Sequence, residues 1–115
     1  MKVLILPSFY CSPEYPTMGI FFKDQAQALL RAGIDVEVLF CEARSLRELS
    51  FRALLQHHWQ REYELEDNIF TMRQCGWNPG VASTRGGRVW SKQVVTLFQR
   101  YLSVRGRPDV IHAHN

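Results

Sequence analysis

The first 33 residues constrain the fold most strongly, because they join a short apolar run to a polar loop and an amphipathic pattern. Residues 3–6 are uniformly apolar, which is typical of a parallel strand covered on both faces. Pro7 ends that run, and residues 8–18 have the proline, serine and threonine content of a loop. Gly19 precedes apolar residues at helical spacing, which are Phe22, Ala26, Leu29 and Leu30. Gly33 follows, and we expect the helix to end there at a residue free to adopt positive φ.

Three further segments have strand patterns. Residues 35–40 alternate and follow the first helix after a two-residue link, which predicts a βαβ unit. In residues 69–75, Phe70 and Met72 alternate with Thr71 and Arg73, so we expect a partly exposed third strand toward a sheet edge. Residues 109–113 follow Pro108 and predict a fourth strand. The expected fold is a Rossmann-like parallel sheet of about four strands with flanking helices, in the spatial order third, second, first, fourth.

The remaining segments are read as helices and a loop. Residues 42–66 carry two apolar stripes at helical spacing and predict a broad-faced helix. Residues 76–87 contain four glycines and a proline, which predicts a long loop that includes Trp77. An aromatic side chain in such a loop either stacks on a sugar or lipid or closes over the core. Residues 88–103 predict a helix with one apolar face.

Composition excludes several classes of protein. With 115 residues, 46% hydrophobic and 22% charged, the chain has room for one folded domain and is neither disordered nor membrane-spanning. A net charge of +3 is too small to indicate nucleic acid binding, although it permits an anionic ligand. Because the apolar run after Met1 is too short for a signal peptide, we expect a cytoplasmic location. The arginines of residues 42–66 are either a solvated face or a peripheral contact with the inner face of a membrane.

The three cysteines, Cys11, Cys41 and Cys75, are odd in number and widely spaced. They support neither a disulfide framework nor a zinc site, and we expect free thiols and no metal. Cys11 lies in the loop after the first strand, where a nucleophile would need a nearby base.

The glycine-bearing loop after the first strand suggests an anion site. A strand, loop and helix start present free N–H groups at the carboxyl edge of a parallel sheet. The alternative is a simple turn, because the dinucleotide pattern G-x-G-x-x-G and the P-loop pattern are both absent. Lys23 falls in the first helical turn, which we expect to be solvated.

Two histidines lie at the end of the fourth expected strand. Since strand side chains alternate, His112 and His114 point to the same side. In the expected strand order, His114 reaches the crevice beside the loop after the first strand. The alternative is a polar strand terminus that bonds only to backbone.

The opening 33 residues, the loop piece GWNP and the closing PDVIHAHN together resemble the N-terminal domain of retaining glycosyltransferases of family 4, which have GT-B architecture. The resemblance implies sugar transfer with retention from a nucleotide-sugar donor to a glycan or lipid-linked acceptor, often in polysaccharide biosynthesis, without metal or cofactor. It assigns His114 to the donor sugar as the catalytic residue, with His112 as its companion, and places Gly19 against the donor and acceptor. We also expect donor or acceptor to be bound by Met18, Lys23, His112 and Trp77, together with Gly19.

The chain departs from that family in extent, because the resemblance stops with Asn115. The family's second domain, with its E-x7-E motif and its phosphate-binding residues, is not covered. We therefore expect residues 1–115 to be a single domain that is incomplete at its C-terminus and inactive alone, with a C-terminal half acting in trans. The alternative is a non-catalytic fragment or interaction module that pairs through an exposed sheet edge. A receiver-like module is disfavoured, because no acidic cluster follows the first strand.

Overall fold

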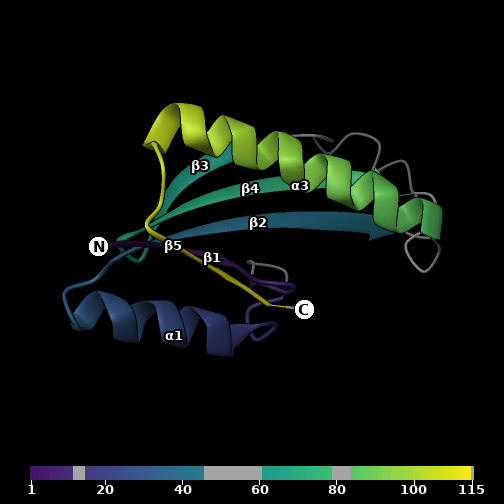
Figure 1. Ribbon diagram of the computed structural model, residues 1–115. Coiled ribbons are helices and arrows are strands. Elements are labelled where there is room, and N and C mark those ends of the chain that lie inside the picture. Colours follow the sequence, from purple (N-terminus) through teal and green to yellow (C-terminus); the bar gives the residue numbers. More distant parts are fainter. Residues whose placement is uncertain (12–14, 46–60, 79–83, 115) are drawn as a thin grey trace.

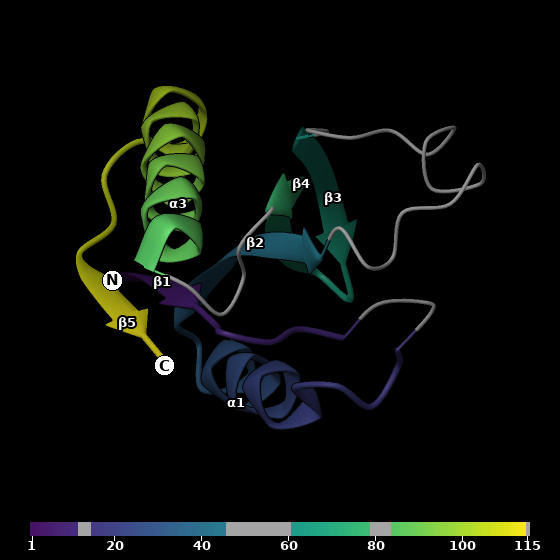
Figure 2. The same cartoon turned by 90° about the vertical axis from the view of Figure 1, so that its right-hand side faces the viewer.

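The computed structural model describes residues 1–11, 15–45, 61–78 and 84–114. They form three layers, in which helices α1 (Ile20–Arg31) and α3 (Thr84–Arg105) cover opposite faces of a five-stranded sheet (Figures 1 and 2). The strands are β1 (Lys2–Leu6), β2 (Asp35–Ser45), β3 (Arg61–Glu66), β4 (Ile69–Asn78) and β5 (Val110–Ala113). The Rossmann-like α/β class is confirmed.

The sheet has the order β3-β4-β2-β1-β5, and only β3 is antiparallel to its neighbour. The four parallel strands follow the predicted order. Leu4 at the centre of β1 lies opposite Glu37 on β2 and Ile111 on β5. The loop after β1 and the end of β5 therefore meet at the same edge of the sheet (Figure 1).

The prediction of a helix over residues 42–66 is wrong at both ends, which the structure describes as strands. Strand β2 continues to Ser45, and residues 61–66 form β3 at the sheet edge. In β3, glutamates alternate with tyrosine and leucine, a two-residue period that suits an edge strand. Asp67 and Asn68, both with positive φ, join it to β4 by the tight turn that suits a hairpin. The middle of the predicted helix, residues 46–60, lies outside the described residues together with two of its four arginines, Arg47 and Arg52, so membrane contact there stays a prediction.

The prediction of a long loop over residues 76–87 is wrong at both ends, because β4 occupies its first residues and α3 its last. Strand β4 runs through Trp77, because the extended β2 supplies a partner for it, with Arg44 opposite Trp77. Trp77 therefore belongs to a strand and not to a loop. Helix α3 begins at Thr84 and contains Gly86 and Gly87. Glycine weakens a helix by about 1 kcal/mol relative to alanine, an amount that the packing of a long helix offsets.

The two faces of the sheet bury separate cores. Val3 and Ile5 of β1 face α1, whereas Leu4 faces α3, as strand alternation requires. Toward α1, the buried core also contains Tyr10, Cys11, Phe22, Ala26, Val36, Val38, Phe40 and Ile69. Toward α3, it contains Leu39, Cys41, Met72, Leu97 and Tyr101.

A buried carboxylate fixes the end of α3 over the sheet. Glu37 of β2 accepts hydrogen bonds from the Tyr101 hydroxyl and, at 2.7 Å, from Nε of Arg105. The Arg105 guanidinium also lies 4.3 Å from the ring centroid of Phe70. These contacts satisfy a charge that would otherwise be unpaired in the core.

Candidate functional site

Gly19, at the end of the loop after β1, packs against the backbone near the beginning of the same loop. It is the N-cap of α1 with φ +68°, in the left-handed region that favours glycine. A Cβ on Gly19 would lie 2.4 Å from the carbonyl oxygen of Phe9 and 3.1 Å from the Tyr10 nitrogen. The chain therefore requires glycine here for its own packing, before any ligand is considered. Met18, the neighbouring candidate, is exposed, and its N–H bonds to the Tyr15 carbonyl at 3.2 Å.

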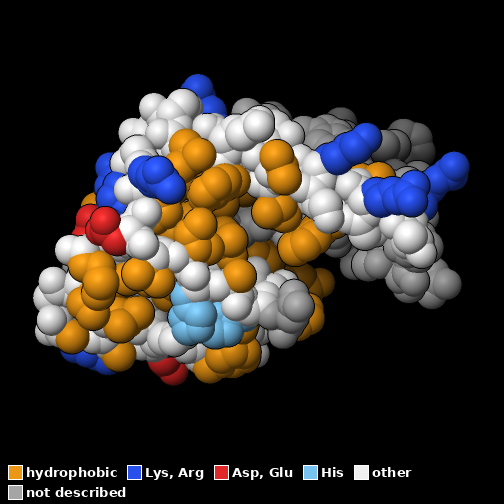
Figure 3. All heavy atoms as spheres, in the orientation of Figure 1, with side chains coloured by type: hydrophobic (Ala, Val, Ile, Leu, Met, Phe, Trp, Pro, Cys, Tyr) orange, Lys and Arg blue, Asp and Glu red, His pale blue; other side chains and the backbone are white. Residues whose placement is uncertain are grey.

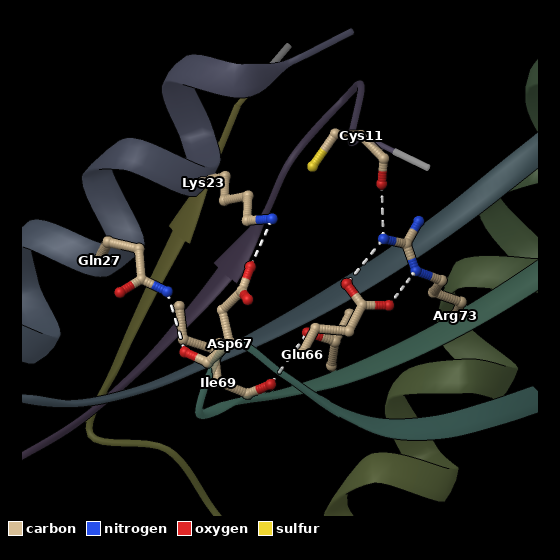
Figure 4. A network of polar contacts seen from close by, with 8 residues as sticks. Cys11, Lys23, Gln27, Glu66, Asp67, Ile69 and Arg73 are labelled. Carbon is tan, nitrogen blue, oxygen red and sulfur yellow. Dashed lines mark hydrogen bonds and ion pairs between the residues drawn. The ribbon is translucent and has the colours of Figure 1, made fainter. Parts of the chain in front are cut away.

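Arg73 of β4 holds the inner part of the same loop (Figure 4). Its Nε and Nη2 donate to the two carboxylate oxygens of Glu66, both at 2.9 Å, and Nη2 also donates to the Cys11 carbonyl at 2.6 Å. Its guanidinium lies 4.9 Å from the Tyr10 ring centroid. Sequence reasoning took the alternation in this strand as a sign of partial exposure and missed this contact. No local pattern signals it, because the Cys11 carbonyl lies 62 residues away.

Lys23 is tied to the body of the fold. Its ammonium group forms a 2.5 Å ion pair with Asp67 of the β3–β4 turn, and Gln27 donates to the Asp67 carbonyl at 2.9 Å (Figure 4). The hydrogen bond to Asp67 raises the pKa of Lys23. The structure gives Lys23 this structural partner, and its predicted role toward a ligand stays a prediction.

His112 and His114 lie together at the end of β5. Their rings are 4.0 Å apart between centroids, which agrees with the predicted shared side. The His114 N–H bonds to the Leu6 carbonyl at 3.0 Å, so the pairing with β1 continues past the strand. The His114 ring packs on Phe22 of α1 at 4.5 Å between centroids, and Gln25 Nε2 lies 3.5 Å from Nδ1 of His112. Figure 3 shows imidazole groups at the surface between hydrophobic side chains.

The electrostatics favour a neutral His114. Burial of the ring, together with the neighbouring His112, lowers the pKa of His114 below 6.5. Its Nε2 is buried and finds no hydrogen-bond partner among the described residues. At neutral pH the ring is therefore a hydrogen-bonding group and not a cation.

The predicted residues Gly19 and His114 are brought together through Phe22. The Gly19 carbonyl accepts the Phe22 N–H at 3.0 Å, and the Phe22 ring contacts His114. Trp77 lies near the end of β4, two strands from β1, and its side chain lies outside the described structure. Phe22 was predicted only as a core residue.

A small apolar cavity of about 90 Å³ lies beneath the same edge on the α3 side. Its lining comes from β1, Pro7, β2, α3 and the end of β5, including Leu6, Cys41, Trp90 and His114. Trp90 Nε1 donates to the Cys41 carbonyl at 3.2 Å. Cys41 and Cys11 are buried free thiols, and burial raises the pKa of Cys41 to about 12. Cys41 is therefore protonated and unreactive at neutral pH.

No three His, Cys, Asp or Glu side chains converge on a common point within residues 1–11, 15–45, 61–78 and 84–114. Neither described helix is long and apolar enough to cross a membrane.

Along nearly its whole length, the chain is similar to a protein of Bacillus subtilis (strain 168) that is named "Putative teichuronic acid biosynthesis glycosyltransferase TuaC". The two are 30% identical over 126 residues, which cover 99% of this chain and 30% of TuaC. The chain thus spans less than a third of the length of this curated relative. No family model matches the chain. No solved structure matches it. The chain is therefore similar to one part of a longer protein that bears the name of a glycosyltransferase.

Proposed function

We propose that this chain forms the N-terminal, acceptor-side part of a retaining glycosyltransferase with GT-B architecture. The observation that carries the proposal is the similarity to a glycosyltransferase over 99% of the chain. The fold supports it, because the loop after β1 and the end of β5 meet at the carboxyl edge of a parallel sheet, where such folds bind ligands. Retention and membership of family 4 rest on the resemblance of the opening and closing motifs.

In this proposal His114 orients the donor sugar and polarises it as the phosphate leaves. A neutral imidazole suits hydrogen bonds to sugar hydroxyls, and Nε2 has unused bonding capacity among the described residues. A buried polar atom without a partner costs roughly 1–3 kcal/mol, so a ligand group that satisfied it would bind favourably. His112 keeps the His114 ring in place from the same side. The contribution of these residues is positional and electrostatic.

The donor phosphates and the rest of the site belong to a second domain in the proposed complete enzyme. The donor is a nucleotide-sugar, and the acceptor is a glycan or a lipid-linked glycan. A matching C-terminal half, supplied in the same chain or in trans, completes the site. The described residues alone hold neither an E-x7-E motif nor a cluster of free basic side chains at the His114 edge.

Sugar transfer tests this proposal directly. The chain is mixed with a matching C-terminal half and incubated with labelled nucleotide-sugars and with glycan or lipid-linked glycan acceptors. We expect transfer in the mixture, and a loss of turnover by orders of magnitude for His114→Ala, because an interaction made in the transition state is removed. Lys92→Ala on the exposed side of α3 is the matched control. Transfer that His114→Ala leaves unchanged would remove His114 from the mechanism.

A second function is favoured by the open β5 edge. Val110 and Ile111 of this terminal strand are half-exposed, and a groove lined by Phe98, Leu102 and Ile111 separates β5 from α3. Figure 3 shows hydrophobic side chains gathered on this face below α3. A non-catalytic module that pairs through this edge would associate with a partner without any dependence on His114. Sedimentation of the mixture, with and without nucleotide-sugar, separates pairing from catalysis.

A further inference from the structure

The apolar cavity beneath the His114 edge has a defined size and a defined lining. Its volume is about 90 Å³, and its walls come from β1 and β2 on one side and from α3 on the other. Leu6, Leu39, Val94 and Leu97 are among its apolar lining residues. His114 also lines it, so the cavity adjoins the candidate site. Figure 3 shows the imidazole groups beside the hydrophobic side chains that gather below α3.

Among the described lining residues, one buried polar side-chain atom has no partner. Trp90 Nε1 donates to the Cys41 carbonyl, and the Cys41 thiol donates to Oε1 of Gln93 at 3.9 Å. In contrast, His114 Nε2 is buried and bonds to no described residue. The cavity therefore offers a ligand apolar walls and a single buried hydrogen-bonding atom.

These properties restrict what the cavity can hold. A buried water molecule needs about three polar partners, so water alone is poorly held here. A hydroxyl group that entered the cavity would meet apolar side chains, and burial of a polar group without a hydrogen bond is unfavourable. An apolar group attached to one polar atom suits the site better, because the apolar part leaves water while the polar atom bonds to His114.

The volume indicates the size of that group. A cavity of about 150 Å³ lined by aliphatic and aromatic side chains holds benzene, so one of about 90 Å³ holds roughly four heavy atoms. An acetamido group has this size, ends in a methyl group, and carries both an N–H and a carbonyl oxygen. It therefore matches either tautomer of a neutral His114 ring. A single C-methyl group would leave most of the cavity unfilled.

We propose that the cavity takes the acetamido group of an N-acetylated sugar, with the methyl group between the apolar walls and the amide bonded to Nε2 of His114. This inference rests on the proposed function and deepens it, because it selects an N-acetylated nucleotide-sugar as the donor. A sugar with a hydroxyl group in place of the acetamido group gains neither contact and binds more weakly.

Titration with small glycosides tests the cavity directly. The 115-residue chain is labelled with nitrogen-15 and titrated with methyl N-acetylglucosaminide or with methyl glucoside, which differ in one substituent. We expect the N-acetylated glycoside to shift the NMR signals of the Trp90 indole N–H and of the His114 ring. It should bind roughly tenfold more tightly than the glucoside, because it gains a buried methyl group and a hydrogen bond.

Two neighbouring valines of α3 provide a matched pair of variants. Val94 lines the cavity, whereas Val95 is 55% exposed and is not among the described lining residues. Val94→Phe places a ring in the cavity and should remove the preference for the N-acetylated glycoside, and Val95→Phe should keep it. Thermal unfolding checks that each variant is folded. Leu6→Phe fills the cavity from β1 and gives the same test if Val94→Phe does not fold.

Three results would overturn the inference. These are equal affinity for the two glycosides, unchanged Trp90 and His114 signals, and a preference that Val94→Phe and Leu6→Phe both retain. A preference for methyl 6-deoxyglucoside over methyl glucoside, without one for the N-acetylated sugar, would assign the cavity to a C-methyl group and would also overturn it.

Sugar transfer in the mixture with a C-terminal half tests the proposed function separately. Transfer only from nucleotide-sugars without an acetamido group would leave the proposed function standing and overturn this inference. Binding of the N-acetylated glycoside in the cavity, without transfer from any nucleotide-sugar, would support the cavity assignment and count against the proposed function.

Discussion

The two sides of the candidate site differ in how fully the described chain stabilises them. The loop after β1 is held by Arg73, by the close packing of Gly19 on Phe9, and by the neighbouring ion pair of Lys23. On the β5 side, the strand pairs only with β1, and Ile111 stays half-exposed at the groove between β5 and α3. Among the described residues, side-chain contacts hold the loop side of the candidate site, whereas strand pairing with β1 holds most of the β5 side.

Among the substitutions considered, removal of the Arg73 side chain should lower the free energy of unfolding most, because Arg73 holds the loop after β1. Arg73→Ala leaves the half-buried Glu66 carboxylate and the Cys11 carbonyl without their donor, so we expect a loss of about 3 kcal/mol in the free energy of unfolding. Urea denaturation measures this loss. Lys92→Ala, an exposed cation on α3, should change stability by less than about 0.5 kcal/mol. Equal effects of the two substitutions would show that Arg73 does not hold the loop.

A methyl group on Gly19 should have the next largest effect. Gly19→Ala combines positive φ with a Cβ 2.4 Å from the Phe9 carbonyl oxygen, and we expect destabilisation of about 2–3 kcal/mol. Gly33 also has positive φ, but no atom lies within 4 Å of its Cβ position. Gly33→Ala should therefore lose only about 1 kcal/mol. If both variants melted at the same temperature, the close contact with Phe9 would contribute nothing.

The His114 environment should make stability depend on pH. Its pKa is lower in the folded chain than the usual 6.5, so the unfolded chain binds a proton first as the pH falls. The contribution of this group is complete above pH 6.5 and is lost as the pH drops through that value toward the lower pKa. Unfolding free energies measured between pH 7.5 and 5.5 should fall less steeply in His114→Gln. An identical slope in both proteins would contradict the burial of this ring.

The smallest effect on stability is expected at the open edge. Ile111→Thr keeps a β-branched side chain on β5 and removes apolar surface that is already half-exposed. We expect a change within about 0.5 kcal/mol in the free energy of unfolding, measured by urea denaturation. A large loss of stability would mean that the β5 edge is already part of a packed core. The β5 edge and the loop after β1 would then not differ in how firmly they are held.

Most of the parallel framework could be predicted from the sequence, because its signals are local. The apolar run of residues 3–6, the helical spacing after Gly19 and the alternation of residues 35–40 each report their own environment. The hairpin of β3 and β4 was missed, because the apolar stripes of residues 42–66 match a helix and its edge strand is mostly glutamate and tyrosine. Trp77 was placed in a loop because glycine composition cannot show that β2 extends far enough to pair with it.

The features of the candidate site also divide into those that a local sequence pattern predicts and those that it does not. The shared side of His112 and His114 follows from strand alternation alone, and the structure places their rings together. The contact between Phe22 and His114 and the clamp by Arg73 join residues that are distant in sequence. Only the packed sheet brings them together. The predicted approach of Gly19 to donor and acceptor stays a prediction. The requirement for glycine that the structure shows comes from the Phe9 backbone, which no local pattern reveals.

The central claim is that the loop after β1 and His114 form one wall of a nucleotide-sugar site. Thermal unfolding of this chain, alone and mixed with a matching C-terminal half, against a panel of nucleotide-sugars tests it most directly. The account predicts a rise in melting temperature in the mixture with one nucleotide-sugar, lost in His114→Ala and kept in Lys92→Ala. No rise with any nucleotide-sugar, or the same rise in both variants, would contradict it.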